Sequence, residues 1–406
     1  MGSPAAMMVE ECWRCQLSCK YTQGTSRRSR VYLTDEADVR AFAERAAASS
    51  VLAVDTEFLR EKTYYPRLCL LQLATAEESA IVDPILVKDL SCIADLFRDT
   101  RITKVFHACG QDLEVIYAAM GCVPDPIFDT QVAAAFLGHR QQIGYGPLVE
   151  AYCGVHLAKA ESLTDWSKRP LDAAQLRYAE EDVSYLPGIY ERMLSELVEK
   201  GRLGWVLPEF QSMLDPSKIV TKPEEAYLHL KRSTSLTKSQ LAITREICAW
   251  REREAARLDV PKRWVLSDEI IVECCRRQPT VPARLLRIRG TEQLTQASIA
   301  AVCNAVKRGL SADISDIKVT HRHARPSAET ESVVDLMYAL LRIKADRYGI
   351  ASQVIATRDD LLEFLRHPET SPLSASWKKE VIGDDLTRLL QGEIGLTVKD
   401  GGIELL

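Results

Sequence analysis

The sequence predicts an α/β domain with a mixed sheet, followed by two small all-helical domains. Between residues 30 and 210, short aliphatic runs alternate with segments of helical periodicity, and the first three runs ("VLAVDTEF", "CLLQLAT" and "SAIVDP") are typical of adjacent strands. From residue 235 on, strand patterns are almost absent until the last dozen residues. A chain of 406 residues is also too long for one ordinary domain. We therefore expect a disordered tail at 1–29, the α/β domain at 30–215, and helical domains at 235–311 and 330–406.

Each later element follows from its local pattern. "DLSCIADLFRD" predicts a helix, "ITKVFHA" a strand, "GQDLEVIYAAMG" a helix closed by Gly121, and "LDAAQLRYAEEDVSYL" a further helix. Strands that lead into a mixture of strands and helices favour a mixed sheet. In the C-terminal half, helical patterns cover residues 238–257, 267–277, 282–288, 296–310, 331–345, 357–366 and 376–391. The polar stretch "KVTHRHARPSAETES" indicates a boundary near 312–330.

Composition indicates a soluble globular protein, with the cytoplasm as its expected location. Hydrophobic residues make up 46% and charged residues 27% of the chain. No apolar run approaches the roughly 18 residues of a membrane span, and the N-terminus lacks the apolar segment of a signal peptide. The twelve cysteines are scattered, as expected for reduced thiols. Cys12, Cys15 and Cys19 form an incomplete zinc set, for which a flexible tail is the simpler interpretation.

The net charge of −5 is unevenly distributed. Residues 238–311 contain 14 Lys and Arg against 8 Asp and Glu, whereas residues 331–406 contain 9 against 13. A basic module beside an acidic one predicts that the first helical domain attracts polyanions. Its candidate phosphate contacts are Arg276, Arg277, Arg284, Arg287 and Arg289. The alternative is that these arginines pair with acids of their own domain.

Asp55 and Glu57 lie two residues apart in an apolar run, so on a strand they share one face. Two like charges ~4 Å apart repel by about 4 kcal/mol at an effective dielectric near 20. Without a partner, at least one of them takes up a proton. A divalent cation such as magnesium or manganese removes the conflict. The alternative is an edge strand with solvated acids, which the pair alone does not exclude.

Three further residues extend this pattern. Asp112 precedes Ile116 by one helical turn and leans toward the buried stripe of its helix, although a first-turn aspartate also favours the helix dipole. Tyr178 and Asp182 are spaced i, i+4 and share a helix face, a spacing that alone is more often a surface contact.

The motifs "DTEF", "HACGQDLEV" and "YAEEDVSYL", in this order, resemble the three exonuclease motifs of the DEDD 3′→5′ exonucleases. A tyrosine four residues before the last aspartate resembles the tyrosine subclass; the histidine subclass has its histidine one residue earlier, where this chain has Arg177. The stretches "DTEFLREKTYYPRLCLLQLA", "FDTQVAAAFLG" and "ESLTDWSKRPL" are similar to the bacterial ribonuclease D family. Residues 235–311 resemble an HRDC domain, and 330–406 a second, more divergent one.

The resemblance implies a ribonuclease H-like sheet and two-metal hydrolysis that releases nucleoside 5′-monophosphates. By similarity, Asp55 bridges two Mg²⁺ or Mn²⁺ ions, Glu57 and Asp182 complete one site, and Asp112 binds the other ion mainly through water. Tyr178 orients the attacking water, because a phenol with a pKa near 10 is too weak a base to act alone. The implied substrates are RNAs with a single-stranded 3′ end, among them tRNA precursors and small structured RNAs. The resemblance implies neither membrane association nor an obligate protein partner.

Other candidates are weaker. Trp166, Lys168 and Arg169 precede the Tyr178 helix and are candidates for a stacking ring and phosphate contacts. Gln72 and Arg67 are candidates for RNA contacts, and His107 is more typical of a structural histidine. Two alternatives to an exoribonuclease stay open: a DNA 3′→5′ exonuclease, which shares the same carboxylates, and a non-catalytic RNA-binding protein, against which the five intact motif residues argue.

Overall fold

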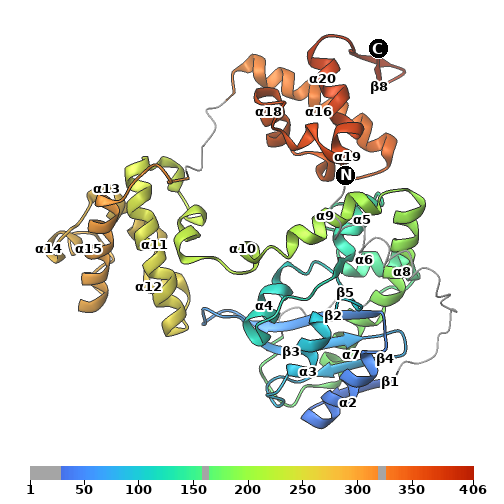
Figure 1. Ribbon diagram of the computed structural model, residues 1–406, viewed down its shortest axis with the longest axis horizontal. Helices are drawn as coiled ribbons and strands as arrows, with labels where there is room; N and C mark the ends of the chain where they lie inside the picture. Colours follow the sequence, from blue (N-terminus) through green and yellow to red (C-terminus); the bar gives the residue numbers. More distant parts are fainter. Residues whose placement is uncertain (1–28, 158–163, 319–325) are drawn as a thin grey trace.

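The computed structural model describes residues 29–157, 164–318 and 326–406 (Figure 1). The predicted tail lies outside the described residues except for Ser29, which begins the first strand. The cysteine cluster of residues 12–19 lies outside them as well. Among the described helices, none combines the length and the apolar character that crossing a membrane requires.

The α/β domain is built on a six-stranded mixed sheet with strand order β1-β4-β3-β2-β5-β6. The strands are β1 (Ser29–Leu33), β2 (Val51–Leu59), β3 (Arg67–Ala74), β4 (Glu78–Val82), β5 (Thr103–Phe106) and β6 (Ile127–Asp129). β3 is antiparallel to both β2 and β4, whereas β1 is parallel to β4, and β2, β5 and β6 are parallel. The predicted mixed sheet, with the first three aliphatic runs as neighbours, is confirmed.

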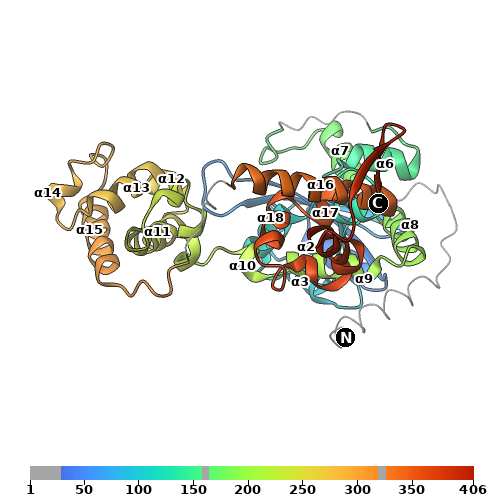
Figure 2. The ribbon, with the colours of Figure 1, turned by 90° about the horizontal axis from the view of Figure 1, so that it is seen from above.

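Helices cover both faces of this sheet (Figure 2). They are α2 (Glu36–Ala46), α3 (Ser91–Arg98), α4 (Gly110–Met120), α5 (Thr130–Phe136), α6 (Tyr145–Cys153), α7 (Ala173–Ser184), α8 (Leu186–Glu199), α9 (Leu203–Met213) and α10 (Pro216–Ile219). α4 ends at Gly121, whose φ of 62° is left-handed and favours glycine. α7 begins with a capping box between Asp172 and Gln175, which satisfies the free backbone donors of its first turn.

The first helical region follows α10 and has a hydrophobic core of its own. Its elements are η1 (Pro223–His229), η2 (Ser233–Ser235), α11 (Lys238–Leu258), α12 (Lys262–Val265), α13 (Asp268–Arg277), α14 (Pro282–Leu285) and α15 (Gln296–Ser311). The core extends from Ala226 to Ile317, so the folded unit is wider than the predicted 235–311. The additional N-terminal part consists of 3₁₀ turns. Because such turns lack the 3.6-residue periodicity of an α-helix, the sequence pattern does not predict them.

The last helical region differs from the first, because its buried residues belong to the same hydrophobic core as the α/β domain. Its elements are α16 (Ala328–Tyr348), α17 (Ser352–Ile355), α18 (Arg358–Arg366), η3 (Pro372–Ser374), α19 (Ser376–Lys378), η4 (Lys379–Gly383), α20 (Asp384–Leu390), β7 (Leu396–Lys399) and β8 (Gly402–Leu405). The helix predicted at 376–391 is present over residues 376–390, with a π-helical segment, η4, that ends at Gly383. A side chain there would meet the carbonyl oxygen of Leu373 at 2.0 Å, so the close packing requires glycine. The final residues form an antiparallel hairpin, β7–β8, so this region is not helical throughout.

Candidate active site

Asp55 and Glu57 lie on the face of β2 that α7 covers. Alternate residues of a strand point to the same side. Leu70, directly opposite Glu57 on β3, belongs with Ala179 of α7 to one apolar cluster on this face. Thr56 points to the opposite face, which α4 covers, and its hydroxyl donates to the Asp112 carboxylate. The β2 strand therefore presents acids to α7 and a hydroxyl to α4.

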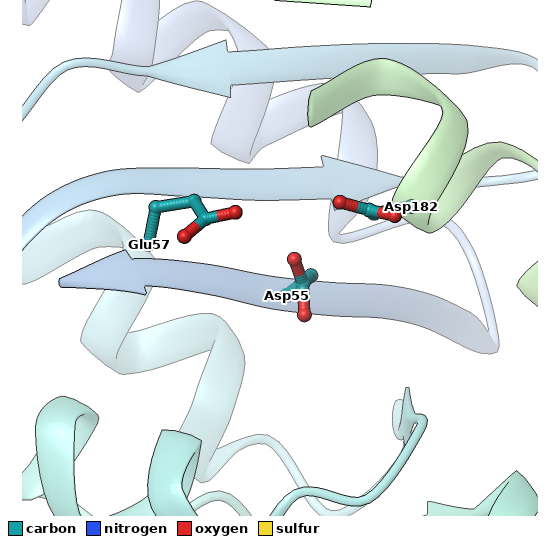
Figure 3. Close-up of side chains that lie close together, drawn as sticks. All are labelled: Asp55, Glu57 and Asp182. Carbon is teal, nitrogen blue, oxygen red and sulfur yellow. The ribbon is translucent and has the colours of Figure 1, made fainter. Parts of the chain in front are cut away.

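Asp182 of α7 completes a cluster with this pair. One carboxylate oxygen from each of Asp55, Glu57 and Asp182 lies within 4.8 Å of the others. Figure 3 shows the three carboxylates, from β2 and α7, turned toward a common space. The Oδ2 atom of Asp182 is buried and has no hydrogen-bond partner among the described residues. A buried carboxylate oxygen without a partner is costly, so the cluster has the character of an incomplete site.

The pKa values of these acids are raised, because burial and mutual repulsion oppose their ionisation. Burial, together with the charges of Asp112 and Asp182, raises the pKa of Asp55 well above its ordinary value. Burial, Asp182 and Asp112 raise the pKa of Glu57 to about 8. Burial raises the pKa of Asp182 to about 7, against a hydrogen bond from Tyr178 that lowers it. All four carboxylates of the site, including that of Asp112, resist ionisation. A bound cation would relieve the repulsion between them and favour their charged forms.

Asp112 is held on the other side of β2 and does not belong to the three-carboxylate cluster. It is 8% exposed, and burial raises its pKa to about 6 although the Thr56 hydroxyl lowers it. Its helix begins after a tight turn in which Ala108 has a φ of 63°. The Asp129 carboxylate, fully buried, accepts the backbone N–H groups of Ala108 and Cys109 and caps α5 as well. Asp129 therefore fixes the start of α4, a role that no local sequence pattern indicates.

Tyr178 shares its face of α7 with Asp182, as the i, i+4 spacing predicts. Burial and the carboxylates of Asp182, Glu57 and Asp55 raise its pKa further above its ordinary value of 10, so the phenol stays protonated. The ring packs against Trp166, with centroids 5.8 Å apart. Trp166 is only 6% exposed, so its ring supports Tyr178. The predicted stacking of this ring on a base is therefore wrong, because the ring is covered.

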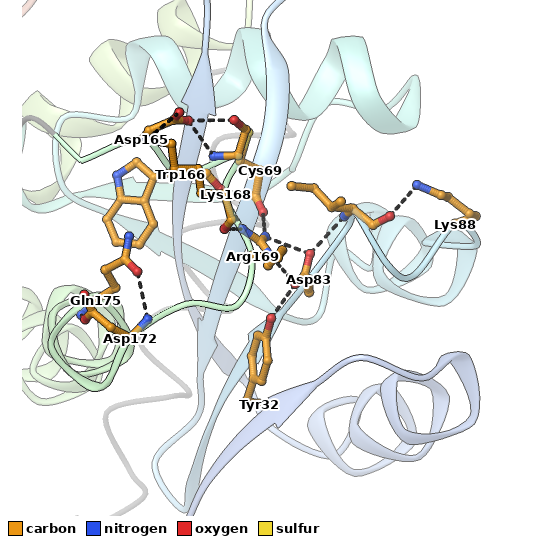
Figure 4. Close-up of polar contacts among 12 residues, drawn as sticks. Tyr32, Cys69, Asp83, Lys88, Asp165, Trp166, Lys168, Arg169, Asp172 and Gln175 are labelled. Atoms are coloured by element: carbon orange, nitrogen blue, oxygen red, sulfur yellow. Dashed lines mark hydrogen bonds and ion pairs between the residues drawn. The ribbon is translucent and has the colours of Figure 1, made fainter.

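Arg169 is engaged within the protein, which removes it from the predicted phosphate contacts. Its guanidinium pairs with the fully buried Asp83, at 2.8 Å for the Nη2–Oδ1 contact, and also donates to the carbonyl oxygens of Cys69 and Trp166 (Figure 4). The Tyr32 hydroxyl donates to the same aspartate. These bonds tie the segment before α7 to β3 and to the end of β4. Arg169 thus positions the helix that carries Tyr178 and Asp182.

The remaining candidates divide by exposure. Lys168 is exposed, with its Nζ 3.7 Å from Asp165, and Arg284, Arg287 and Arg289 are exposed in the first helical region. The His107 ring nitrogens lie 2.9 Å from the Thr130 hydroxyl and 3.0 Å from the Ile143 carbonyl oxygen, a structural arrangement. Gln72 is fully buried and therefore does not touch RNA directly.

The residues present fit a divalent cation. Three carboxylates converge at ligand distance, one buried oxygen among them is unpartnered, and hard oxygen donors are those that Mg²⁺ and Mn²⁺ prefer. A mixed sheet with this acidic cluster between a central strand and a covering helix fits a metal-dependent nuclease, and the family model described as a 3′-5′ exonuclease matches residues 31–198. A second model, the HRDC domain, matches residues 240–301.

Relatives and solved structures give the family. Ribonuclease D of Granulibacter bethesdensis is 36% identical over 92% of this chain and 96% of its own length. The enzyme of Acidiphilium cryptum is 37% identical over 90% and 94%. The crystal structure of Escherichia coli RNase D, described as an exoribonuclease involved in structured RNA processing, superposes with a TM-score of 0.76 at 28% identity, covering 90% of this chain and 99% of that one. The chain belongs to the ribonuclease D family and is a 3′→5′ exoribonuclease.

Proposed function

We propose that this exoribonuclease removes nucleoside 5′-monophosphates one at a time, with Asp55, Glu57, Asp112 and Asp182 holding two divalent ions, Mg²⁺ or Mn²⁺. The charges of the other three acids all act on Asp55, which is the residue we assign to both ions. Glu57 and Asp182 complete one ion's site, and Asp112 serves the other. The observation that carries the proposal is the convergence of Asp55, Glu57 and Asp182 around a buried, unpartnered carboxylate oxygen.

The protein's own residues supply position and proton control. Two divalent ions, when bound, activate the attacking water and neutralise charge on the attacking and leaving oxygens. The Tyr178 hydroxyl, protonated because its pKa is raised, is available to orient that water by a hydrogen bond. Trp166 and the Asp83–Arg169 pair hold α7 in place, so that the hydroxyl and the Asp182 carboxylate keep their positions relative to β2.

The substrate we propose is RNA with a single-stranded 3′ end, in particular tRNA precursors with 3′ extensions and small structured RNAs. The family membership and the description of the E. coli enzyme support this choice. We also propose action in the cytoplasm without an obligate protein partner; the nine described cysteines are free, as in a reducing compartment. Digestion of matched RNA and DNA single strands tests the alternative, because a strong preference for DNA would contradict this proposal.

The direct test uses a tRNA carrying a short 3′ extension, incubated with Mn²⁺ or Mg²⁺ and with excess EDTA. We expect mononucleotide release with metal and none with EDTA. Asp55→Asn keeps the size of the side chain but halves its acceptor capacity and removes its charge, so we expect an unchanged fold by circular dichroism and loss of hydrolysis by at least a thousandfold. Undiminished activity of this variant would overturn the metal assignment.

Tyr178→Phe separates orientation from metal binding. The ring and its packing on Trp166 remain, and only the hydroxyl is lost. We expect turnover to fall by about ten- to a hundredfold, with metal affinity within about twofold of the wild type. A parallel loss of metal affinity, measured by titration calorimetry with Mn²⁺, would assign Tyr178 to the metal site instead.

A further inference from the structure

A cleft of about 610 Å³ lies between the α/β domain and the first helical region. We call it the hairpin cleft, because the turn that joins β2 to β3, residues 60–66, forms one wall. α4 and the segment after α10 contribute to the floor, and α11 and α12 form the opposite wall. Its lining includes Arg60, Tyr65, Glu114, Tyr117, Lys262 and Arg263.

The hairpin cleft lies along the same two elements, β2 and α4, that carry three of the active-site acids. β2 runs from Asp55 and Glu57 directly to Arg60, and a strand rises about 3.3 Å per residue, so Arg60 is roughly 10 Å beyond Glu57. On α4, Glu114 and Tyr117 follow Asp112 within two helical turns. Arg60 and Glu114 are joined by an ion pair, with Nη1 2.5 Å from Oε2. The cleft therefore lies near the carboxylates, at a distance that a few nucleotides of a single strand span.

The chemistry of the lining suits a single strand of nucleic acid. Tyr65 is 49% exposed and Tyr117 42% exposed, although large aromatic side chains are usually covered. Such rings stack on bases of any sequence. The exposure of two rings in one cleft is more than scattered surface apolarity.

The charges of the cleft point the same way. Each of its three acids pairs with a cation: Glu114 with Arg60, Glu252 with Lys262, and Asp268 with Arg251. Arg263 is exposed and has no ion pair among the described residues, so it is the surplus cation of the lining. A paired set of acids plus an unpaired arginine leaves the cleft attractive to phosphate.

We propose that the hairpin cleft binds the single-stranded RNA immediately 5′ of the nucleotide being removed, with bases stacked on Tyr65 and Tyr117 and a phosphate held by Arg263. This inference rests on the proposed function and adds the path of the substrate. It also changes the expectation for the first helical region. Arg284, Arg287 and Arg289 lie at and after α14, at the end of that region farthest from the sheet, whereas α12 faces the β2–β3 hairpin (Figures 1 and 2).

The test measures binding rather than hydrolysis, so a wrong metal assignment does not obscure it. In the Asp55→Asn background, affinity for fluorescent oligoadenylates of two to twelve nucleotides is measured for the parent and for Tyr65→Ala/Tyr117→Ala. We expect the double variant to bind the longer strands about tenfold or more weakly, with the difference vanishing for strands too short to reach the cleft. Tyr65→Phe/Tyr117→Phe keeps both rings and should bind like the parent. Equal affinities of the alanine variant and the parent at every length would overturn the proposal.

A crosslinking experiment compares the two faces of the helical region. RNA carrying 4-thiouridine three to five nucleotides from the 3′ end is irradiated with the Asp55→Asn protein, and the attached peptides are identified. We expect crosslinks in residues 60–66, in α4 or in α12. Crosslinks confined to residues 284–289 would contradict the cleft and favour the distal arginines. Arg263→Ser should weaken binding of long strands more than Arg287→Ser, its matched control in an equally exposed position.

A separate observation concerns Gln72 of β3, which pairs in register with Asp55 across the antiparallel ladder. Directly opposed residues of neighbouring strands point to the same face, with Cβ atoms about 5 Å apart. Gln72 is fully buried, and neither its Nε2 nor its Oε1 has a hydrogen-bond partner among the described residues. An unpaired buried amide is destabilising, typically by about 1–3 kcal/mol, so its partner belongs to another state of the site.

We infer that Gln72 is a positioning residue whose amide N–H supports the Asp55 carboxylate when that carboxylate holds a cation. Gln72→Met keeps the size and removes the amide. We expect the metal-free variant to melt at a higher temperature than the parent and its affinity for Mn²⁺ to fall severalfold. A higher melting temperature with unchanged Mn²⁺ affinity would show that Gln72 is only an uncompensated buried amide.

Discussion

The two helical regions are joined to the α/β domain in opposite ways. The last region shares its hydrophobic core with that domain: Trp377 stacks on Trp205 with centroids 4.9 Å apart and an interplanar angle of 12°, and also packs on Phe136. The first region keeps a separate core. Its hairpin contacts are polar: the Tyr64 and Tyr65 amides donate to Asp259, at 3.0 and 3.1 Å, and the Tyr64 hydroxyl donates to Glu252 at 2.9 Å.

Backbone packing reinforces this difference. The Arg202 guanidinium, 9% exposed as a residue, donates to the carbonyl oxygens of Phe136 and Tyr348, bridging the α/β domain and the last region. A side chain at Gly138 would lie 2.8 Å from the carbonyl oxygen of Gly349, and the Ala351 amide donates to Ala135 at 3.2 Å. Apolar, closely packed interfaces hold domains rigidly, whereas small polar ones permit relative motion. We therefore expect the last region to be part of the catalytic body and the first to be a movable arm that closes the hairpin cleft.

The largest expected effect is that of Trp377→Ala. Truncating a buried tryptophan costs about 3–5 kcal/mol of unfolding free energy, through lost burial and the cavity left behind. Because the core is shared, we expect this loss in the transition that also unfolds the sheet. Urea denaturation followed by circular dichroism measures it.

Trp264→Ala is the matched control for that change, because Trp264 lies on α12 of the first region and is 58% exposed. We expect it to alter the unfolding free energy by less than about 0.5 kcal/mol. If Trp377→Ala lowered the stability of the last region alone and left the unfolding of the sheet unchanged, the shared core would be refuted.

Metal binding should distinguish the two regions next. At a free concentration a hundred times Kd, a bound cation adds about 2.7 kcal/mol to the body that contains its site. We expect Mn²⁺ to raise the melting temperature of the sheet together with the last region, and to leave the transition of the first region in place. Hydrogen exchange at increasing temperature resolves the three regions in one experiment; protection gained equally in α11 and α16 would contradict the division.

The stabilisation of the folded protein by Mn²⁺ should depend on pH, and the raised pKa of Glu57 gives the direction of this dependence. In EDTA, the folded-state pKa of Glu57 is raised to about 8 from an ordinary value near 4, so folding takes up a proton in this interval. The stability contributed by the protonated acid is complete below pH 4 and is lost as pH rises through about 8. The cation binds the charged carboxylates, so the stabilisation by Mn²⁺ should be larger at pH 8 than at pH 6. An equal shift at both values would mean that these acids are already ionised without metal.

Local periodicity predicted the two halves of the carboxylate cluster, and the resemblance to exonuclease motifs predicted that they come together. A period of two placed Asp55 and Glu57 on one face of a strand, and a spacing of four placed Tyr178 with Asp182 on one helix face. The bounds of α11, α13 and α15 lie within about one residue of those predicted from apolar spacing and caps. In each case, the signal lies within a few residues of the feature.

Contacts between distant segments were not predictable in this way. Nothing in the sequence ties Asp83 to Arg169, so Arg169 was assigned to RNA when its partner is a buried aspartate at the end of β4. The stacking of Trp377 on Trp205 is also a contact between distant segments and has no local sequence pattern. The sequence therefore did not predict that the two helical regions are joined to the α/β domain in different ways. The exposure of individual aromatic side chains was not predictable from the sequence either. Trp166 is covered and Tyr65 is exposed, although both are aromatic residues in polar stretches.

The smallest expected effect, and the sharpest probe of the arm, is that of Asp259→Gly. Asp259 ends α11 with a left-handed φ of 50°, a conformation that glycine adopts without strain, so the variant keeps the helix end and loses only the carboxylate. The exposed hydrogen bonds to Tyr64 and Tyr65 are worth about 1 kcal/mol, so the melting temperature of the sheet should hardly move. Amide exchange at residues 64 and 65 should nevertheless accelerate, and small-angle scattering should show a more extended protein. Asp259→Asn keeps an acceptor oxygen and should behave like the parent; unaltered exchange in the glycine variant would mean that the arm is held by contacts other than these.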